Sequence, residues 1–227
     1  MPVLEQYRRQ VRLLVRLLIH ADGSQVKIEV SLVLRGVVRD PAVMPVTAGV
    51  EAAFGFAETN VVSFDDLYAG KLVAALDRQH PRDFFDVRWL LDAEGLTDSL
   101  RETFLVYLLS HNRPMGEVLS GRVKDLTADY RDGFDGMTEV AIPLETLRAT
   151  QAELIDQLIR QMSDRHRSFL IGFEKGNPDW SLLAVPHARD LPAIRWRQWN
   201  LDRLSVEKRR SLVSLLEHSL ERRLAPR

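Results

Sequence analysis

The chain has 227 residues, 45% hydrophobic and 28% charged, which is typical of a globular protein with one large domain or two small ones. Its formal net charge of −1 excludes a uniformly basic surface, so any contact with nucleic acid must come from a local patch. The absence of cysteine excludes disulfides, thiolate catalysis and cysteine-ligated metal sites, and no apolar run reaches the roughly 18 residues that span a bilayer.

Residues 14–34 predict a β-hairpin. Two runs rich in β-forming residues, 14–21 and 26–32, flank Asp22-Gly23-Ser24, and an Asp-Gly pair favours a tight turn because glycine tolerates a positive φ. Apolar and polar residues alternate in the second run, which predicts a strand with one buried face. A helix over residues 4–18 is the alternative.

A proline-punctuated connection is predicted at residues 36–47, followed by a short helix at 50–54 and a short strand at 60–62. The two consecutive valines after Asn60 favour the strand. These elements add one strand to the hairpin, so the predicted β structure is small.

Two consecutive helices are predicted next. Ser63 with Asp66 three residues later has the pattern of a helix N-cap, so the first helix begins directly after Ser63. It ends near His80, because Pro81 suits only the first turn of a new helix. The second helix extends to about residue 93.

The rest of the chain has the apolar spacing of helices. The predicted fold class is therefore α+β, a β-hairpin plus a short strand followed by a C-terminal helical bundle. The domain boundary is predicted near Gly95, giving domains 1–95 and 96–227. Further helices are predicted at residues 98–110, 121–131, 144–162, 164–173, 191–200 and 205–224.

Three cationic residues in the predicted helix pair are candidates for phosphate binding. Lys71 and Arg78 lie seven residues apart, two helical turns, and therefore share one face of their helix. Lysine binds phosphate as a point charge, and arginine, here also Arg82, adds a planar fork of donors. The alternative is a solvated helix face whose cations pair with Asp77 or Asp66.

Two carboxylates follow closely. Asp83 and Asp86 lie three residues apart and share one face of the second helix, where they are expected to orient the cations or hold a metal ion. The alternative is that they are ordinary acidic residues of a helix N-terminus, favoured there by the helix dipole.

Glu29 is a third candidate carboxylate. It lies on the polar face of the predicted strand 26–32, where its oxygens would suit Mg²⁺, which usually takes one or two carboxylates plus substrate phosphates. The alternative is a cross-strand pair with Arg16 or Lys27.

Basic and aromatic residues lie together near the C-terminus. Trp196 and Trp199 alternate with Arg195 and Arg197, and the cluster Lys208-Arg209-Arg210 follows. RNA phosphates and stacked bases could use such a surface. The alternative is that the two tryptophans, three residues apart, are anchors of the core.

Taken together, these residues resemble the AbiEii/AbiGii family of nucleotidyltransferase toxins of type IV toxin–antitoxin and abortive-infection systems. The likeness covers roughly residues 14–200. A family motif of a lysine, an acid–arginine pair and an Arg-Asp pair is met by Lys71, Asp77-Arg78 and Arg82-Asp83. The stretches that carry the likeness are residues 25–30, 34–36, 62–71, 77–87, 110–114 and 176–180.

The resemblance implies a nucleotidyltransferase-like sheet, of which the hairpin and the short strand are a part, and transfer of a nucleotidyl group from an NTP to an acceptor such as tRNA. It also implies a divalent metal such as Mg²⁺, for which Glu29 is the candidate ligand in this sequence, and a cognate antitoxin. Lys71, Arg78 and Arg82 would bind the nucleotide, and Lys71, Asp83 and Asp86 would be the catalytic residues. A role in phage defence in the cytoplasm, without a membrane, is implied as well.

The sequence departs from the family pattern at the metal site. It contains no Asp-x-Asp, and its Gly23-Ser24 pair falls in the predicted hairpin turn instead of at a helix start. We therefore expect the chain alone to be inactive, as the product of an N-terminally truncated gene or a mis-set start codon. The alternative is a non-catalytic module that binds RNA or protein. An exposed sheet edge would also permit a homo-oligomer.

Overall fold

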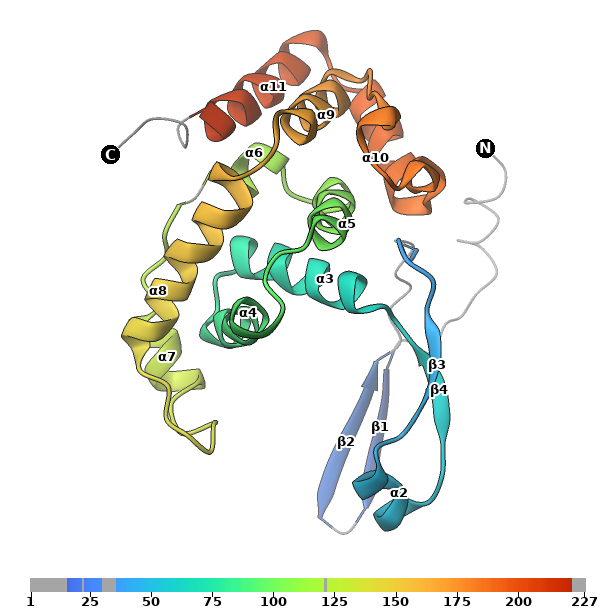
Figure 1. Cartoon of the computed structure of the whole chain (residues 1–227), viewed down its shortest axis with the longest axis vertical. Helices are drawn as coiled ribbons and strands as arrows, with labels where there is room; N and C mark the ends of the chain where they lie inside the picture. Colours follow the sequence, from blue (N-terminus) through green and yellow to red (C-terminus); the bar gives the residue numbers. More distant parts are fainter. Residues whose placement is uncertain (1–15, 22, 30–35, 121, 222–227) are drawn as a thin grey trace. The chain divides into compact units, whose positions relative to one another are not determined.

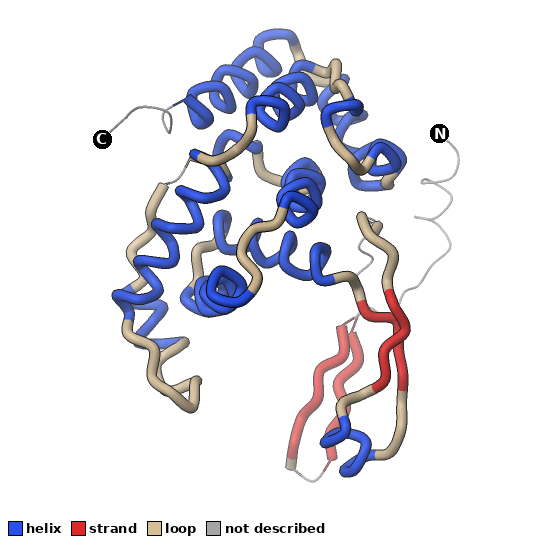
Figure 2. Tube along the Cα trace, viewed as in Figure 1, coloured by secondary structure: helices blue, strands red, loops and turns tan. Residues whose placement is uncertain are grey.

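The computed structural model describes residues 16–21, 23–29, 36–120 and 122–221 (Figure 1). Contacts divide the chain into two compact units, Met1–Leu34 and Arg35–Arg227, and each unit is described by itself. The α+β fold class is confirmed. Two small antiparallel sheets accompany helices that make up most of the described chain (Figure 2).

The first unit contains a β-hairpin. Strands β1 (Arg16–Ala21) and β2 (Ser24–Glu29) pair antiparallel, which places Arg16 opposite Glu29. Gly23, in the turn, has a φ of 76°, a conformation that glycine adopts at no steric cost. The predicted hairpin is therefore confirmed over its described residues.

Two other predictions for the N-terminal region, a helix over residues 4–18 and a buried face on the second strand, are not confirmed. The helix alternative over residues 4–18 is wrong at residues 16–18, which form a strand, and its other residues lie outside the described part of the chain. The buried face predicted for the second strand is not observed at Val26, which is 55% exposed. Residues 30–34 of the predicted hairpin also lie outside the described residues.

The second unit begins with another two-stranded antiparallel sheet. Strand β3 (Ala42–Pro45) pairs with β4 (Glu58–Val61), and helix α2 (Ala48–Phe54) lies in the connection between them. The short helix and the short strand are thus confirmed. Strand β3 was not predicted, because prolines are disfavoured inside sheets and tolerated chiefly at edges such as this one.

Helices α3 (Phe64–Asp77) and α4 (Pro81–Ala93) begin as the sequence predicted. The Ser63 hydroxyl accepts a hydrogen bond from the backbone N–H of Asp66 at 3.0 Å, and Pro81 occupies the first turn of α4. Helix α3 ends three residues before the predicted His80. Local capping chemistry therefore sets the start of both helices.

The turn between α3 and α4 is held by Gln79, which has a φ of 51°. Its side-chain oxygen accepts hydrogen bonds from the backbone N–H of Lys124 at 2.8 Å and from Gln151 Nε2 at 2.7 Å. Gln79 also donates to the carbonyl of Arg122 at 2.5 Å. These bonds fix the turn, and with it the relative position of the two helices.

The remaining helices agree with prediction except in one region. The helix predicted at residues 121–131 is wrong in its bounds, since α7 begins at Thr127 and ends at Gly133, and the short helix α6 was not predicted. The bounds are α5 Asp98–Leu109, α6 Met115–Val118, α7 Thr127–Gly133, α8 Leu144–Ile155, a π-helix Asp156–Arg160, α9 Asp164–Lys175, 3₁₀-helices Trp180–Leu182 and Pro186–Asp190, α10 Pro192–Asp202 and α11 Val206–Glu221.

The core of the second unit is formed by packed helices. Helix α3 packs against α4 and α5, α4 packs against α8, and α11 packs against α6 and α9. Small residues permit two close approaches, because a Cβ at Gly70 would lie 3.4 Å from the Tyr107 ring and one at Gly116 would lie 2.8 Å from the Leu216 backbone nitrogen. The division at residue 95 stays a prediction.

Asp66 has a structural position in this unit. Its carboxylate accepts hydrogen bonds from the backbone N–H groups of Val38 and Arg39 at 2.8 and 2.9 Å. It also accepts from the Ser63 hydroxyl at 2.8 Å and from the Tyr107 hydroxyl at 3.0 Å. Asp66 therefore joins the first turn of α3 to the segment before β3 and to α5.

Candidate functional site

Lys71 forms an ion pair across the two predicted helices. Its Nζ on α3 lies 2.5 Å from Oδ2 of Asp86 on α4. The two side chains are 31% and 35% exposed, so solvent and small solutes reach both partners. A partly exposed pair of this kind contributes little to stability.

Arg78 pairs with the other carboxylate. Its Nε and Nη2 donate to the two oxygens of Asp83 at 2.7 and 2.5 Å, a bidentate arrangement. The Asp83 side chain is only 4% exposed, whereas that of Arg78 is 66% exposed. Asp83 therefore holds one edge of the guanidinium from inside the protein, and the Nη1 donors remain on the solvent side.

The two pairs form one group of charges, which we call the α3–α4 charge cluster: Lys71, Arg78, Asp83 and Asp86. The hydrogen bond to Asp83 raises the pKa of Arg78, and the charges of Asp83, Asp77 and Asp86 raise it further, although burial lowers it. The predicted shared face of Lys71 and Arg78 is confirmed, because both contact α4.

The alternative that Lys71 pairs with Asp77 or Asp66 is wrong. Asp66 is buried and bonded to the segment before β3, and Asp77 faces the end of α5. Lys71 and Arg78 instead pair with the two carboxylates that the sequence singled out. The roles of all four residues in nucleotide binding or catalysis stay predictions.

Arg82 is directed to a different part of the unit. Its Nε donates to the carbonyl of Gly133 at 3.2 Å, and its Nη2 lies 3.0 Å from the sulfur of Met137. The structure therefore brings four of the five predicted residues of the helix pair together and links Arg82 to the end of α7.

A second group of charged residues borders the cluster. Arg113 donates to Asp77 and, at 3.3 Å, to Glu117, while His111 Nε2 lies 3.4 Å from Asp77. The hydrogen bond to Asp77 raises the pKa of Arg113. Sequence reasoning assigned no role to these residues, although residues 110–114 carried part of the family likeness and were the signal that could have found them.

The described carboxylates do not fit a divalent metal site. Both oxygens of Asp83 accept from the Arg78 guanidinium, and one oxygen of Asp86 accepts from the Lys71 ammonium group, so a metal ion would have to compete with both cations. Within the described ranges, no group of three His, Cys, Asp or Glu side chains is arranged to hold a metal ion. The structure describes the backbone of Glu29 but not its side chain, so binding of a metal ion by Glu29 stays a prediction.

The tryptophans near the C-terminus are surface residues. Trp196 is 54% exposed and Trp199 is 40% exposed, so the alternative that they are core anchors is wrong. Their rings stack with centroids 5.0 Å apart and an interplanar angle of 22°. The guanidinium of Arg203 lies 4.3 Å from the centroid of the Trp199 ring.

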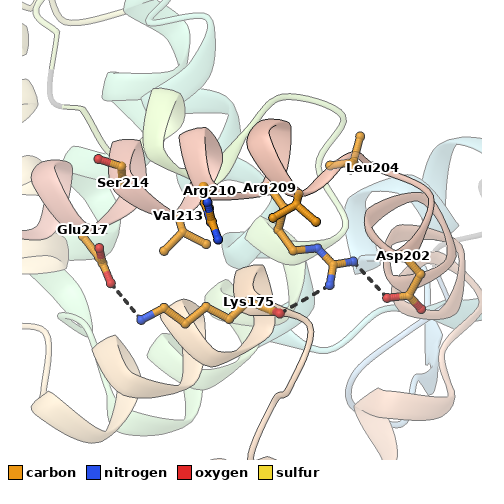
Figure 3. A pocket seen from close by; sticks show the side chains of 9 residues that line it. Lys175, Asp202, Leu204, Arg209, Arg210, Val213, Ser214 and Glu217 are labelled. Atoms are coloured by element: carbon orange, nitrogen blue, oxygen red, sulfur yellow. Dashed lines mark hydrogen bonds and ion pairs between the residues drawn. The ribbon is translucent and has the colours of Figure 1, made fainter.

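Arg209 and Arg210 of the predicted Lys208-Arg209-Arg210 cluster line a hollow of about 600 Å³ between α9 and α11 (Figure 3). Arg209 bridges to the Lys175 carbonyl at 3.4 Å and to Asp202 at 3.1 Å, and Lys175 pairs with Glu217 at 2.9 Å. Most of the charges here are therefore neutralised locally. The lining residues are Lys175, Asp202, Leu204, Val206, Arg209, Arg210, Val213, Ser214 and Glu217.

These features define an α+β protein in which two helices carry a cluster of paired cations and carboxylates. Comparison with known proteins makes the assignment specific. The family model described as nucleotidyl transferase AbiEii toxin, type IV TA system, matches residues 3–197, and the chain belongs to this family. The family supports a nucleotidyltransferase-like function in a type IV toxin–antitoxin system.

No curated protein and no solved structure matches the chain. None of the described helices is long and apolar enough to cross a membrane.

Proposed function

We propose that this chain provides the nucleotide-binding part of a type IV toxin–antitoxin nucleotidyltransferase, with Lys71 and Arg78 binding the phosphates of an NTP. The observation that carries the proposal is the α3–α4 charge cluster. It brings an exposed guanidinium and a partly exposed ammonium group, each paired with a carboxylate of α4, to the same helix pair.

The cluster divides its carboxylates between two tasks. Buried Asp83 fixes the plane of Arg78, so little side-chain freedom is lost when the remaining donors bind phosphate. Half-exposed Asp86 neutralises Lys71 until a phosphate takes its place. Arg82 would bind the nucleotide only after leaving Gly133 and Met137.

We propose further that the chain alone does not transfer nucleotides to tRNA. The family reaction uses a divalent metal, and the sequence offers no Asp-x-Asp to bind one. Asp86 and Asp83 are already paired with Lys71 and Arg78. Lys71, Asp83 and Asp86 stay candidate catalytic residues for a complete site.

Calorimetric titration of each NTP in EDTA tests the binding site without metal. We expect binding that weakens about tenfold or more in Lys71→Ala and Arg78→Ala, since a hydrogen bond to a charged group contributes about 1.5–3 kcal/mol. Lys124→Ala is the matched control, because Lys124 forms an equally short ion pair with Asp129, 2.5 Å, outside the cluster. Equal losses in all three variants, or no binding, would contradict the proposal.

The two carboxylates should respond in opposite directions. Asp86→Ala frees Lys71 and should raise NTP affinity, whereas Asp83→Ala releases the guanidinium and should lower it. The same titration measures both. If both variants bound NTP as the unmodified chain does, the assigned tasks would be wrong.

Transfer is tested by incubating the chain with Mg²⁺, labelled NTPs and total tRNA. We expect no labelled tRNA. Robust labelling that disappears in Lys71→Ala would overturn the proposed inactivity, although it would support Lys71 as part of the nucleotide site.

The second candidate function is a non-catalytic module that binds RNA or protein, and the exposed tryptophans of α10 favour it. The family implies an antitoxin partner. We also propose, from the sequence, that the chain can form a homo-oligomer through a strand edge. A cytoplasmic location is likewise a proposal from the sequence. Light scattering after gel filtration measures the oligomeric state directly.

A further inference from the structure

We propose that Trp196, Trp199 and Arg203, which we call the tryptophan platform, bind unpaired nucleotides of single-stranded RNA by stacking. The choice of RNA as the polymer rests on the proposed function, whereas the stacking itself does not. The family match ends at residue 197, inside α10, so Trp199 and Arg203 lie beyond it.

The platform consists of two stacked indole rings on α10 and the guanidinium of Arg203, the residue directly after the helix. Trp199 stacks on Trp196, which lies one turn before it, and Arg203, one turn after it, covers the Trp199 ring. The order along the helix is therefore Trp196, Trp199, Arg203. The residues one turn before Trp196 are Pro192 and Ala193, whose short side chains place no long group from α10 over that end of the stack.

The platform is built on a fixed helix. Ile194 and Leu201, seven residues apart, are 0% and 2% exposed and anchor the opposite side of α10 in the core. Glu174 on α9 lies 3.6 Å from Arg197, and this ion pair links the middle of α10 to α9. A rigid platform loses little conformational entropy on binding, which favours association with a flat ligand.

The charge around the platform matches a polyanion. Arg197 in the same helix is offset by Glu174, so the exposed cations nearest to the platform in the sequence, besides Arg203, are Arg189 and Arg195. Arg189 and Arg195 share the single carboxylate of Asp190, at 3.5 and 3.8 Å, and their side chains are 62% and 71% exposed. Cations next to the stack suit phosphates that flank a stacked base.

This combination favours nucleic acid over a protein partner. Every base has a π-face that extends an existing aromatic stack, and basic grooves with aromatic residues are the usual means of binding single strands. Paired bases in a duplex are already stacked on each other, so the platform should discriminate against duplex RNA.

Fluorescence anisotropy with a labelled 12-nucleotide single-stranded RNA tests the proposal. We expect Trp196→Leu and Trp199→Leu to weaken binding by about fivefold to a hundredfold each, the range of one lost base–aromatic stack. Trp196→Phe should retain part of the affinity, because phenylalanine keeps a π-face. Trp89→Leu on α4 is the matched control, since Trp89 is 60% exposed and lies outside the platform.

Two further probes complete the experiment. A duplex RNA of the same length should bind at least tenfold more weakly, and single-stranded DNA of the same sequence separates RNA recognition from stacking alone. Equal binding of RNA and DNA would overturn the assignment to RNA. Unchanged RNA binding in Trp196→Leu, equal binding of the duplex, or no RNA binding would overturn the platform.

The nucleotide site can fail independently of the platform. Trp196→Leu should leave NTP binding unchanged, and Lys71→Ala should leave the stacking contribution to RNA binding unchanged. If a protein rather than RNA occupied the platform, RNA binding would not depend on Trp196 at all, and the proposal would be wrong.

Discussion

Replacing Asp66 and Asp86 separately distinguishes a structural carboxylate from one at an accessible site. Asp66→Ala removes the acceptor of four hydrogen bonds, two of them from backbone N–H groups of the segment before β3. A hydrogen bond to a charged group contributes about 1.5–3 kcal/mol, so losing the two backbone bonds alone costs about 3–6 kcal/mol. Asp86→Ala removes one half-exposed ion pair and should cost less than about 1 kcal/mol.

Urea unfolding at pH 7, followed by far-ultraviolet circular dichroism, measures both free energies of unfolding. Asp66→Asn is an informative control, because it keeps one carbonyl acceptor and should lose less than Asp66→Ala. A loss below about 1 kcal/mol in Asp66→Ala, or equal losses in the Asp66 and Asp86 variants, would refute the assignment.

Three other changes have defined outcomes. Gly116→Ala should cost about 1–3 kcal/mol in urea unfolding, because its Cβ would lie 2.8 Å from the Leu216 backbone nitrogen, and unchanged stability would contradict this packing. Burial raises the pKa of the Glu174 carboxyl, although the charge of Arg197 opposes the shift. The folded state therefore binds the carboxyl proton more tightly than the unfolded state, and stability falls as pH rises. In thermal melts Glu174→Gln should remove this pH dependence. Burial lowers the pKa of His166, so stability falls as pH drops below about 6.5, and His166→Gln should flatten this slope.

The elements that the sequence predicted well depend on short-range chemistry. Ser63 and Pro81 set the starts of α3 and α4 through local capping and a fixed φ, and Gly23 permits the hairpin turn. Each of these signals acts within a few residues, so it is visible without a partner segment. Strand β3 lacks such a signal and exists through its pairing with β4.

The partners of the charged residues were not predictable in the same way. The partner of Lys71 depends on how α3 and α4 cross, and this is fixed by the Gln79 bonds to residues 124 and 151, far away in the sequence. The exposure of Trp196 to solvent was also not predictable from the sequence. A spacing of three residues places two tryptophans on one helix face, but it does not say whether that face meets the core or solvent.

The two proposed sites differ in how far their cations are neutralised by carboxylates, and we therefore expect them to respond differently to salt. In the α3–α4 charge cluster each cation already has a carboxylate partner, so a phosphate must displace a charge before it binds. Around the tryptophan platform, arginines outnumber the carboxylates that face them. Added salt should therefore weaken RNA binding steeply, with a slope set by the phosphates contacted, and should affect NTP binding less, because salt also weakens the competing internal pairs. Equal salt dependence of the two ligands would indicate that both bind the same basic surface.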